Sequence, residues 1–176
     1  MKFIKTKFKD AFIIEIDKIN DSRGFFSRSW DTNIFKENNL NEKIVQCNIS
    51  FNKKKGTLRG MHFQKFPHNE VKLIRCTKGK IFDVIIDLRE KSKTYKKWNS
   101  VELSENNYKM LYVPEGFAHG FQTLEENTEV FYQMSEFYEP ESSTGIRWDD
   151  NIFKINWPIV PPIISKKDLS YKLFMD

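Results

Sequence analysis

The stretch EVKLIRCTKGKIFDVIIDLR, residues 70–89, carries the pattern that decides the fold. Apolar and polar side chains alternate with a period of two in both halves, as they do in a strand with one buried face. Gly79 supplies a turn between the halves, so the stretch predicts a β-hairpin. The second strand has an apolar face of Phe82, Val84, Ile86 and Leu88, and its other face carries Asp83, Asp87 and Arg89.

The same alternation recurs along the rest of the chain. We expect further strands at residues 98–103, 109–114, 120–124 and 128–138. Helix is expected only at 31–40, where Asp31 or Thr32 would be the N-cap, and in a short C-terminal segment at 165–174. Many short strands at even spacing are typical of a sandwich or barrel, and here they predict an all-β jelly roll.

The composition is that of one globular domain. The 176 residues are 39% hydrophobic, and no repeat or linker divides them, so we expect a single domain at 1–176. No apolar run approaches the ~18 residues of a membrane span, and the N-terminal MKFIKTKFKDAF lacks an apolar signal core. Cys47 and Cys76 are expected to be buried free thiols. These features predict a cytoplasmic protein with no membrane partner.

The net charge of +5 bears on the kind of ligand. Most lysines are scattered among Asn and Glu, as on a solvated surface. The excess positive charge would attract an anionic small molecule. Because the chain has no basic helix, zinc-ligand pattern or aromatic RNA-binding signature, we expect no nucleic-acid partner.

GTLRGMHFQ, residues 56–64, is an unusual strand because it carries both an arginine and a histidine. In a regular strand Arg59 and His62 would point to opposite faces. Glycine inside a strand often marks a bulge, and a bulge at Gly60 would bring the two side chains to the same side. The interior of the jelly roll would then hold a fixed cation beside a titratable base. The alternative is a flat strand with Arg59 in solvent.

Two histidines and two tyrosines favour a pocket. A lone His on an apolar strand is usually a hydrogen-bonded core residue, but His62 and His119 both lie next to glycines, whereas His68 has the surroundings of a loop. Tyr132 and Tyr138 share a strand face about 20 Å apart. That spacing suits the two ends of an elongated ligand. The alternative is that both tyrosines pack in a barrel with their hydroxyls bonded to backbone.

A resemblance covers most of the chain, from about Asp21 to Asp168. RGMHFQ and PEGFAHGF together are specific, whereas either alone would only suggest a cupin. The chain resembles the dTDP-4-dehydrorhamnose 3,5-epimerase family, which implies a cupin-type jelly roll, a homodimer, and no metal or redox cofactor. The segments that carry the resemblance are, in order, DSRGFFSRSW, QCNIS, GTLRGMHFQ, VKLIRCTKGKIFDVIIDLREKS, LYVPEGFAHGF, FYQMSEFYEPE, GIRWDD and ISKKD.

The resemblance also implies a mechanism. A ketone at C4 of a nucleotide-linked sugar acidifies the C–H bonds at C3 and C5. His62 would be the base, oriented by Asp168, since a carboxylate on one imidazole nitrogen fixes the tautomer. Lys72 would stabilise the enolate near O4. Tyr132 would return a proton on the opposite face of the sugar.

The family's binding positions carry over residue by residue. Tyr138 matches the aromatic residue that stacks on the base. Arg23 lies in the N-terminal part, which in relatives reaches the neighbouring subunit's site, so that dimerisation would be functional. The positions that match contacts to the diphosphate, sugar or nucleotide are Arg23, Gln46, Asn48, Arg59, His119 and Lys167.

Two positions depart from the family pattern. Arg28 and Ser143 stand where relatives usually have glutamate on the nucleotide side of the site. The loss of two negative charges would change which base is preferred. The substrate is therefore either a dTDP-linked 4-keto-6-deoxyhexose or a GDP-linked 4-keto-6-deoxyheptose. The motifs leave open whether C3, C5 or both carbons invert.

Three other functions compete with this interpretation. A metal-dependent cupin would use His62, Glu70 and His119, since Gln64 stands at the usual second His position. A nucleotide-sugar 3,4-ketoisomerase shares the fold but usually lacks the R-G-x-H-F-Q motif and the Tyr132-type pairing. A non-catalytic sugar-binding module would keep Arg59 and Tyr138 but would have no reason to keep His62, Asp168 and Tyr132 together.

Overall fold

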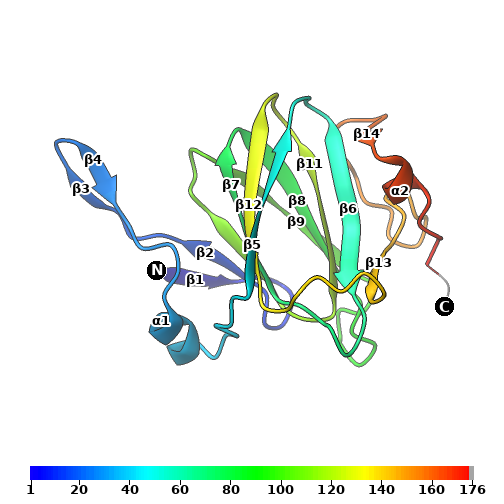
Figure 1. Cartoon of the computed structure of the whole chain (residues 1–176), viewed down its shortest axis with the longest axis horizontal. Coiled ribbons are helices and arrows are strands. Elements are labelled where there is room, and N and C mark those ends of the chain that lie inside the picture. The colour runs from blue at the N-terminus through cyan, green and yellow to red at the C-terminus, as the bar shows by residue number, and fades with distance from the viewer. Residues whose placement is uncertain (175–176) are drawn as a thin grey trace.

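The computed structural model describes residues 1–174, and two facing β-sheets dominate them (Figure 1). The first sheet has the order β1 (Lys2–Lys5), β2 (Phe12–Glu15), β10 (Met110–Val113), β7 (Lys72–Lys78), β12 (Thr128–Met134), β5 (Gln46–Asn52). The second has the order β13 (Ser143–Gly145), β6 (Thr57–Gln64), β11 (Phe117–Thr123), β8 (Lys80–Asp87), β9 (Trp98–Ser104). β14 (Ile163–Ile164) runs parallel to β6. The predicted all-β fold is confirmed.

The predicted hairpin at residues 70–89 is wrong. β7 pairs with β10 and β12, whereas β8 pairs with β11 and β9, so the chain passes from one sheet to the other at Gly79. Gly79 has φ +73, and a Cβ there would lie 2.6 Å from Thr128 Oγ1. Alternation identified the segments as strands, but Asp83 and Asp87, on the face predicted to be polar, are fully buried. The pattern also carries no information on which strand is the partner.

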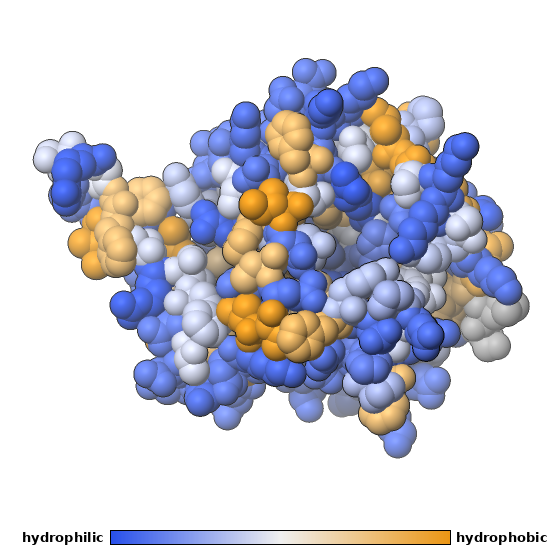
Figure 2. Space-filling model, in the orientation of Figure 1, coloured by the Kyte–Doolittle hydropathy of each residue, from blue (hydrophilic) through white to orange (hydrophobic). Residues whose placement is uncertain are grey.

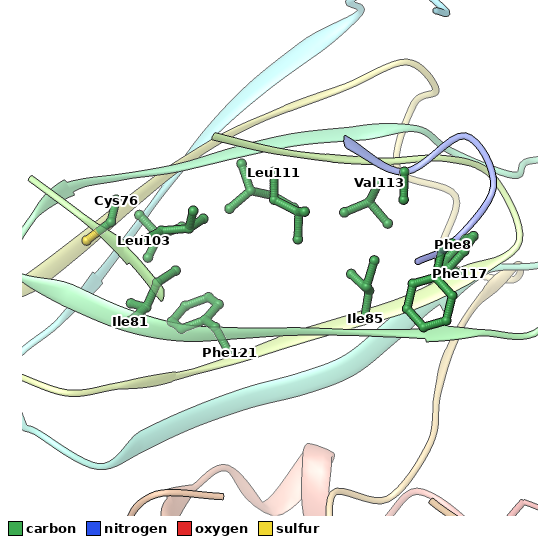
Figure 3. Packing of buried hydrophobic residues seen from close by; sticks show 12 residues of the cluster. Phe8, Cys76, Ile81, Ile85, Leu103, Leu111, Val113, Phe117 and Phe121 are labelled. Atoms are coloured by element: carbon green, nitrogen blue, oxygen red, sulfur yellow. The ribbon is translucent and has the colours of Figure 1, made fainter. Parts of the chain in front are cut away.

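The core lies between the sheets because strands from both bury one face there. Figure 3 shows this cluster, in which Cys76 and Leu111 of the first sheet meet Ile81, Ile85 and Phe121 of the second. The opposite face of β8, predicted to be apolar, packs with Val84 and Ile86 against a second cluster beneath the C-terminal segment. Each such fully buried aliphatic side chain contributes about 1.5–3 kcal/mol relative to an exposed one.

Both predicted helices are present and short. α1 (Thr32–Glu37) is capped by Asp31, whose carboxylate accepts from the amides of Asn33 and Ile34. α2 (Lys166–Leu169) is capped by Ser165 and lies beside β6 (Figure 1). Neither helix within residues 1–174 is long or apolar enough to cross a membrane.

A third, two-stranded unit projects from the body of the molecule. β3 (Ile19–Asp21) and β4 (Gly24–Phe26) form this hairpin (Figure 1). Its apolar side chains Ile19 and Phe26 are exposed, and Figure 2 shows apolar surface both there and along β5. On β5, Cys47 is exposed, which corrects the expectation of two buried thiols, whereas Cys76 is buried.

Candidate active site

A bulge at Gly60 brings the site together. His62 pairs with His119 and Arg59 with Phe121, so β6 has one residue more than β11 between these pairs. Gly60 has φ +144, and a Cβ there would lie only 2.6 Å from the Cα of Gly120. Arg59 and His62 therefore line the same cavity, as predicted.

The cavity lies between the two sheets and has a volume of about 390 Å³. The second sheet supplies Arg59, His62 and His119, and the first sheet supplies Lys72 and Tyr132. Figure 2 shows this face of the molecule hollowed between β5 and β6. The imidazole of His62 and the phenol of Tyr132 thus approach the cavity from opposite sheets.

His62 is held by a carboxylate from α2. Its Nε2 lies 2.7 Å from Oδ1 of Asp168, which is 5% exposed. Burial acts to raise the pKa of Asp168, but the hydrogen bond from His62, the imidazole charge and the Gly60 amide outweigh it and hold this pKa below its ordinary value. The N-cap hydroxyl of Ser165, 3.0 Å from the Asp168 amide, fixes the backbone that carries the carboxylate.

Lys72 is fixed beside His62 by a buried ion pair. Its Nζ lies 2.8 Å from Oε1 of Glu70 and donates to the carbonyl oxygen of His62 at 3.2 Å. The other oxygen of Glu70 accepts from the amide of Gln64 at 3.0 Å. Both members of the pair are 7% exposed, so the ammonium is held in one place at the cavity wall.

Tyr132 is half-buried on β12. Burial raises the pKa of its phenol, and the positive charge of Arg59 opposes this only partly. The hydroxyl therefore remains protonated near neutral pH and is able to donate a proton.

Two further side chains are positioned by partners that the sequence analysis did not identify. Arg59 Nε donates to Oδ1 of the buried Asn52 at 2.7 Å. His119 Nε2 lies 2.6 Å from Oδ1 of Asp83, which is fully buried. Strand parity had placed Asp83 on the polar face of β8, but the pairing of β8 with β11 was needed to bring it to His119.

Three predicted binding residues, Tyr138, Ser143 and Lys167, line the cavity, whereas Gln46 and Asn48 on β5 do not. Gln46 Oε1 instead accepts from the amide of Tyr138 at 2.7 Å and so holds the segment that follows β12. Asn48 Nδ2 lies 3.6 Å from Sδ of Met134.

Arg23 and Arg28 lie outside the cavity of their own chain. Arg23 is in the projecting hairpin and pairs with Asp21 at 2.6 Å, and Arg28 pairs with Asp31 at 3.1 Å. Their side chains are 87% and 60% exposed, so both are accessible to another molecule.

The residues of the metal-cupin alternative already have other partners. His62 and His119 each bond an aspartate through Nε2, and Glu70 bonds Lys72. Gln64 uses its amide to hold the backbone of two loops, donating to His68 O and Phe137 O at 2.8 and 3.0 Å. Within residues 1–174, no group of three or more His, Cys, Asp and Glu could hold a metal ion.

Tyr171 is a cavity residue that the sequence analysis missed altogether. Its ring contacts the ring of His62, with centroids 5.8 Å apart and an interplanar angle of 70°. The signal available in the sequence was its position three residues after Asp168, on the far side of a short helix.

Comparisons with known proteins identify the family of this chain. A family model described as dTDP-4-dehydrorhamnose 3,5-epimerase matches residues 5–176. A relative of that name from Shigella flexneri is 41% identical over 178 residues, which cover 100% of this chain and 97% of the relative.

Two solved structures are similar throughout. The Bacillus anthracis dTDP-4-dehydrorhamnose 3,5-epimerase, with TDP and PPi bound, has a TM-score of 0.95 and 42% identity over 98% of this chain and 99% of that one. A Legionella pneumophila dTDP-6-deoxy-D-glucose-3,5-epimerase in complex with dTDP-4-keto-L-rhamnose has a TM-score of 0.91 and 35% identity, covering 98% and 92%. These likenesses extend over both sheets and confirm the cupin-type jelly roll.

Proposed function

The chain belongs to the dTDP-4-dehydrorhamnose 3,5-epimerase family and is an isomerase, and we propose that it inverts carbons next to the ketone of a nucleotide-linked 4-keto-6-deoxy sugar. The observation that carries the proposal is the placement of His62 and Tyr132 on opposite sheets around one cavity. A base and an acid on opposite sides of a sugar ring are what inversion at carbon requires, because the proton leaves one face and returns to the other.

The base is His62. The ionised carboxylate of Asp168 can only accept a hydrogen bond, so Nε2 carries the proton and Nδ1 carries the lone pair that removes hydrogen from carbon. The electron pair of the broken C–H bond moves into the enolate, whose charge rests on O4. The ammonium of Lys72, held by Glu70, stabilises that oxyanion.

The acid is Tyr132. Its phenol donates a proton to the enolate carbon from the first sheet. The proton gained by His62 leaves to solvent, and the Tyr132 phenolate takes a proton from solvent to complete the cycle. Positioned general acids and bases contribute typically ~10²–10⁴-fold each. The scheme moves protons without changing the oxidation state of the sugar overall, so it needs no metal or redox cofactor. A sugar-binding module would have no use for the pairs that orient His62 and Lys72.

We propose a dTDP-linked 4-keto-6-deoxyhexose as the substrate, because the similar structures hold TDP or dTDP-4-keto-L-rhamnose. Arg59, His119 and Lys167 would bind the sugar and diphosphate, and Tyr138 would stack on the base. A GDP-linked 4-keto-6-deoxyheptose is the second candidate. It is favoured by Ser143, which lines the cavity where relatives usually carry a carboxylate. The reaction would run in the cytoplasm, where free thiols such as Cys47 and Cys76 stay reduced.

We also propose a homodimer in which the β3–β4 hairpin reaches the site of a second copy. The exposed Ile19 and Phe26 of the hairpin, and Ile49 and Phe51 on the edge strand β5, offer apolar surface for such a contact. Arg23, exposed on the hairpin, would then supply its charge to the neighbour's diphosphate.

The proposal is tested by offering dTDP- and GDP-linked 4-keto sugars to the enzyme in D₂O and following deuterium at C3 and C5 by NMR. We expect exchange with the dTDP sugar, and His62→Asn should abolish it. Exchange with the GDP sugar alone would overturn the choice of nucleotide. Undiminished exchange in His62→Asn would overturn the assignment of the base.

A further inference from the structure

We propose that Tyr171 binds the diphosphate of the substrate through its hydroxyl and, through its ring, holds the imidazole of His62 in position. This inference rests on the proposed function and deepens it at the same site. It adds a second phenol, on the His62 side of the cavity, to the one that Tyr132 supplies from the opposite sheet.

The ring contact carries the positioning role. The rings of Tyr171 and His62 meet edge to face, at 5.8 Å between centroids and 70° between planes. Edge-to-face aromatic pairs are favourable and directional. Asp168, three residues earlier, bonds Nε2 of the same imidazole at 2.7 Å. One short segment therefore contacts His62 at a nitrogen and across the ring, so the two contacts together limit both its tilt and its rotation.

The ring of Tyr171 packs against a glycine of the second sheet. Gly145 on β13 is the residue paired with His62 on β6. A Cβ at position 145 would lie 2.5 Å from Cε2 of Tyr171 and 2.7 Å from the carbonyl oxygen of Met61. Glycine at this position thus leaves the space that the Tyr171 ring fills beside the imidazole.

The hydroxyl of Tyr171 is the group that we expect to donate a hydrogen bond to the ligand. Burial raises the pKa of Tyr171, and the negative charge of Asp168 and Tyr138 raises it further, so the phenol remains a donor. Within residues 1–174 this hydroxyl makes no hydrogen bond to protein. A protonated donor on a cavity wall without a protein partner is available to a ligand.

The position along the cavity points to the diphosphate. The side chain of Tyr171 lines the cavity together with His62 and Tyr138. In the proposed function, His62 acts on the sugar and Tyr138 stacks on the base. The diphosphate joins those two parts of the ligand. The cationic Lys167 lines the same cavity, which is consistent with phosphate oxygens between them.

The two roles are separated by two substitutions. Tyr171→Phe keeps the ring and removes the hydroxyl, so we expect the Kd of dTDP, measured by calorimetry, to rise about tenfold while the deuterium exchange rate at saturating substrate stays within about twofold. Tyr171→Ala also removes the ring. We expect its deuterium exchange rate at saturating substrate to be about tenfold lower than that of Tyr171→Phe, because His62 is no longer held. Tyr95→Phe, which alters a tyrosine outside the cavity, should change neither quantity.

The outcomes distinguish this inference from the proposed function. An unchanged Kd of dTDP in Tyr171→Phe overturns the binding role, whether or not the wild-type enzyme catalyses exchange. Equal saturating rates in the Phe and Ala variants overturn the positioning role. A wild-type enzyme that binds dTDP but exchanges no deuterium would refute the epimerase proposal. The binding role of Tyr171 would still be decided by comparing the Kd of dTDP between wild type and Tyr171→Phe. Thermal unfolding of each variant shows whether a loss reflects misfolding.

Discussion

Gly60 shows how one residue decides which side chains meet. Without the extra residue in β6, Arg59 and His62 would face opposite sides of the sheet. The sequence was sufficient to predict this bulge, because glycine between two polar residues in an apolar strand is a local signal. The partners of these side chains were not predictable in the same way. Asp83 and Asn52 reach their partners only after the strands of the two sheets have been placed against each other.

Gly60→Ala is expected to destabilise the protein by about 3 kcal/mol, because the new Cβ would combine a positive φ with a clash against the backbone of Gly120. Gly24→Ala is a matched control, since Gly24 has φ +137 but no atom within 4 Å of a Cβ there. Gly24→Ala should cost only about 1 kcal/mol, because the strained backbone conformation is not accompanied by a clash. Urea unfolding measures the free energy of unfolding of both variants, and an equal decrease in the two would contradict the steric role of Gly60.

At the scale of elements, alternation predicted where the strands lie better than how they pair. β7 and β8 follow one another along the chain but lie in different sheets. The end of β12 was also predicted wrongly. The alternation continues to Tyr138, but the strand ends at Met134. The backbone that follows is held by Gln46, which accepts a hydrogen bond from the amide of Tyr138. Alternation is a property of one segment, whereas strand ends and partners depend on the other segments packed around it.

Asp87 at the end of β8 anchors the following loop, and this predicts a pH-dependent stability. Its buried carboxylate accepts from Arg89, Ser92 and Thr94. Although burial opposes ionisation, these bonds lower the pKa of Asp87 from 3.8 to about 2. The stabilisation is therefore complete above the unfolded-state pKa and is lost as the pH falls towards about 2.

Asp87→Asn should accordingly lower the free energy of unfolding by about 3 kcal/mol at pH 7, and the difference from wild type should shrink on acidification below about pH 4. Asp149→Asn is the control, because Asp149 forms an exposed pair with Arg147 and should cost under about 1 kcal/mol. Urea titrations at pH 7 and pH 3 provide the comparison. A difference that stays constant between these pH values would show that the carboxylate charge is not the stabilising feature.

At the scale of the whole molecule, two sheets enclose both a core and a cavity, and we propose that residues 1–176 form one domain around them. The projecting hairpin is the exception, since its side chains Ile19 and Phe26 remain about two-thirds exposed. The arrangement leaves Arg23 far from the cavity in its own chain and exposed to another. Contact with a second copy of the chain would bury the apolar side chains of the hairpin and bring Arg23 to the neighbour's cavity, as proposed above.

Mixed dimers test whether Arg23 acts in the site of the neighbouring subunit. Arg23→Ala and His62→Asn should each be nearly inactive alone. If Arg23 serves the neighbouring subunit, refolding the two variants together restores one complete site per mixed dimer, and activity should return to roughly a quarter of the wild-type value for random mixing. If both residues act within one chain, the mixture will stay as inactive as its components.

The central claim is that an imidazole and a phenol act on the sugar from opposite sheets, and Tyr132→Phe in D₂O tests it most directly. His62 should still remove hydrogen and return deuterium to the same face, so NMR should show deuterium entering next to the ketone while the configuration there is retained. Inversion at the wild-type rate in this variant would contradict the account.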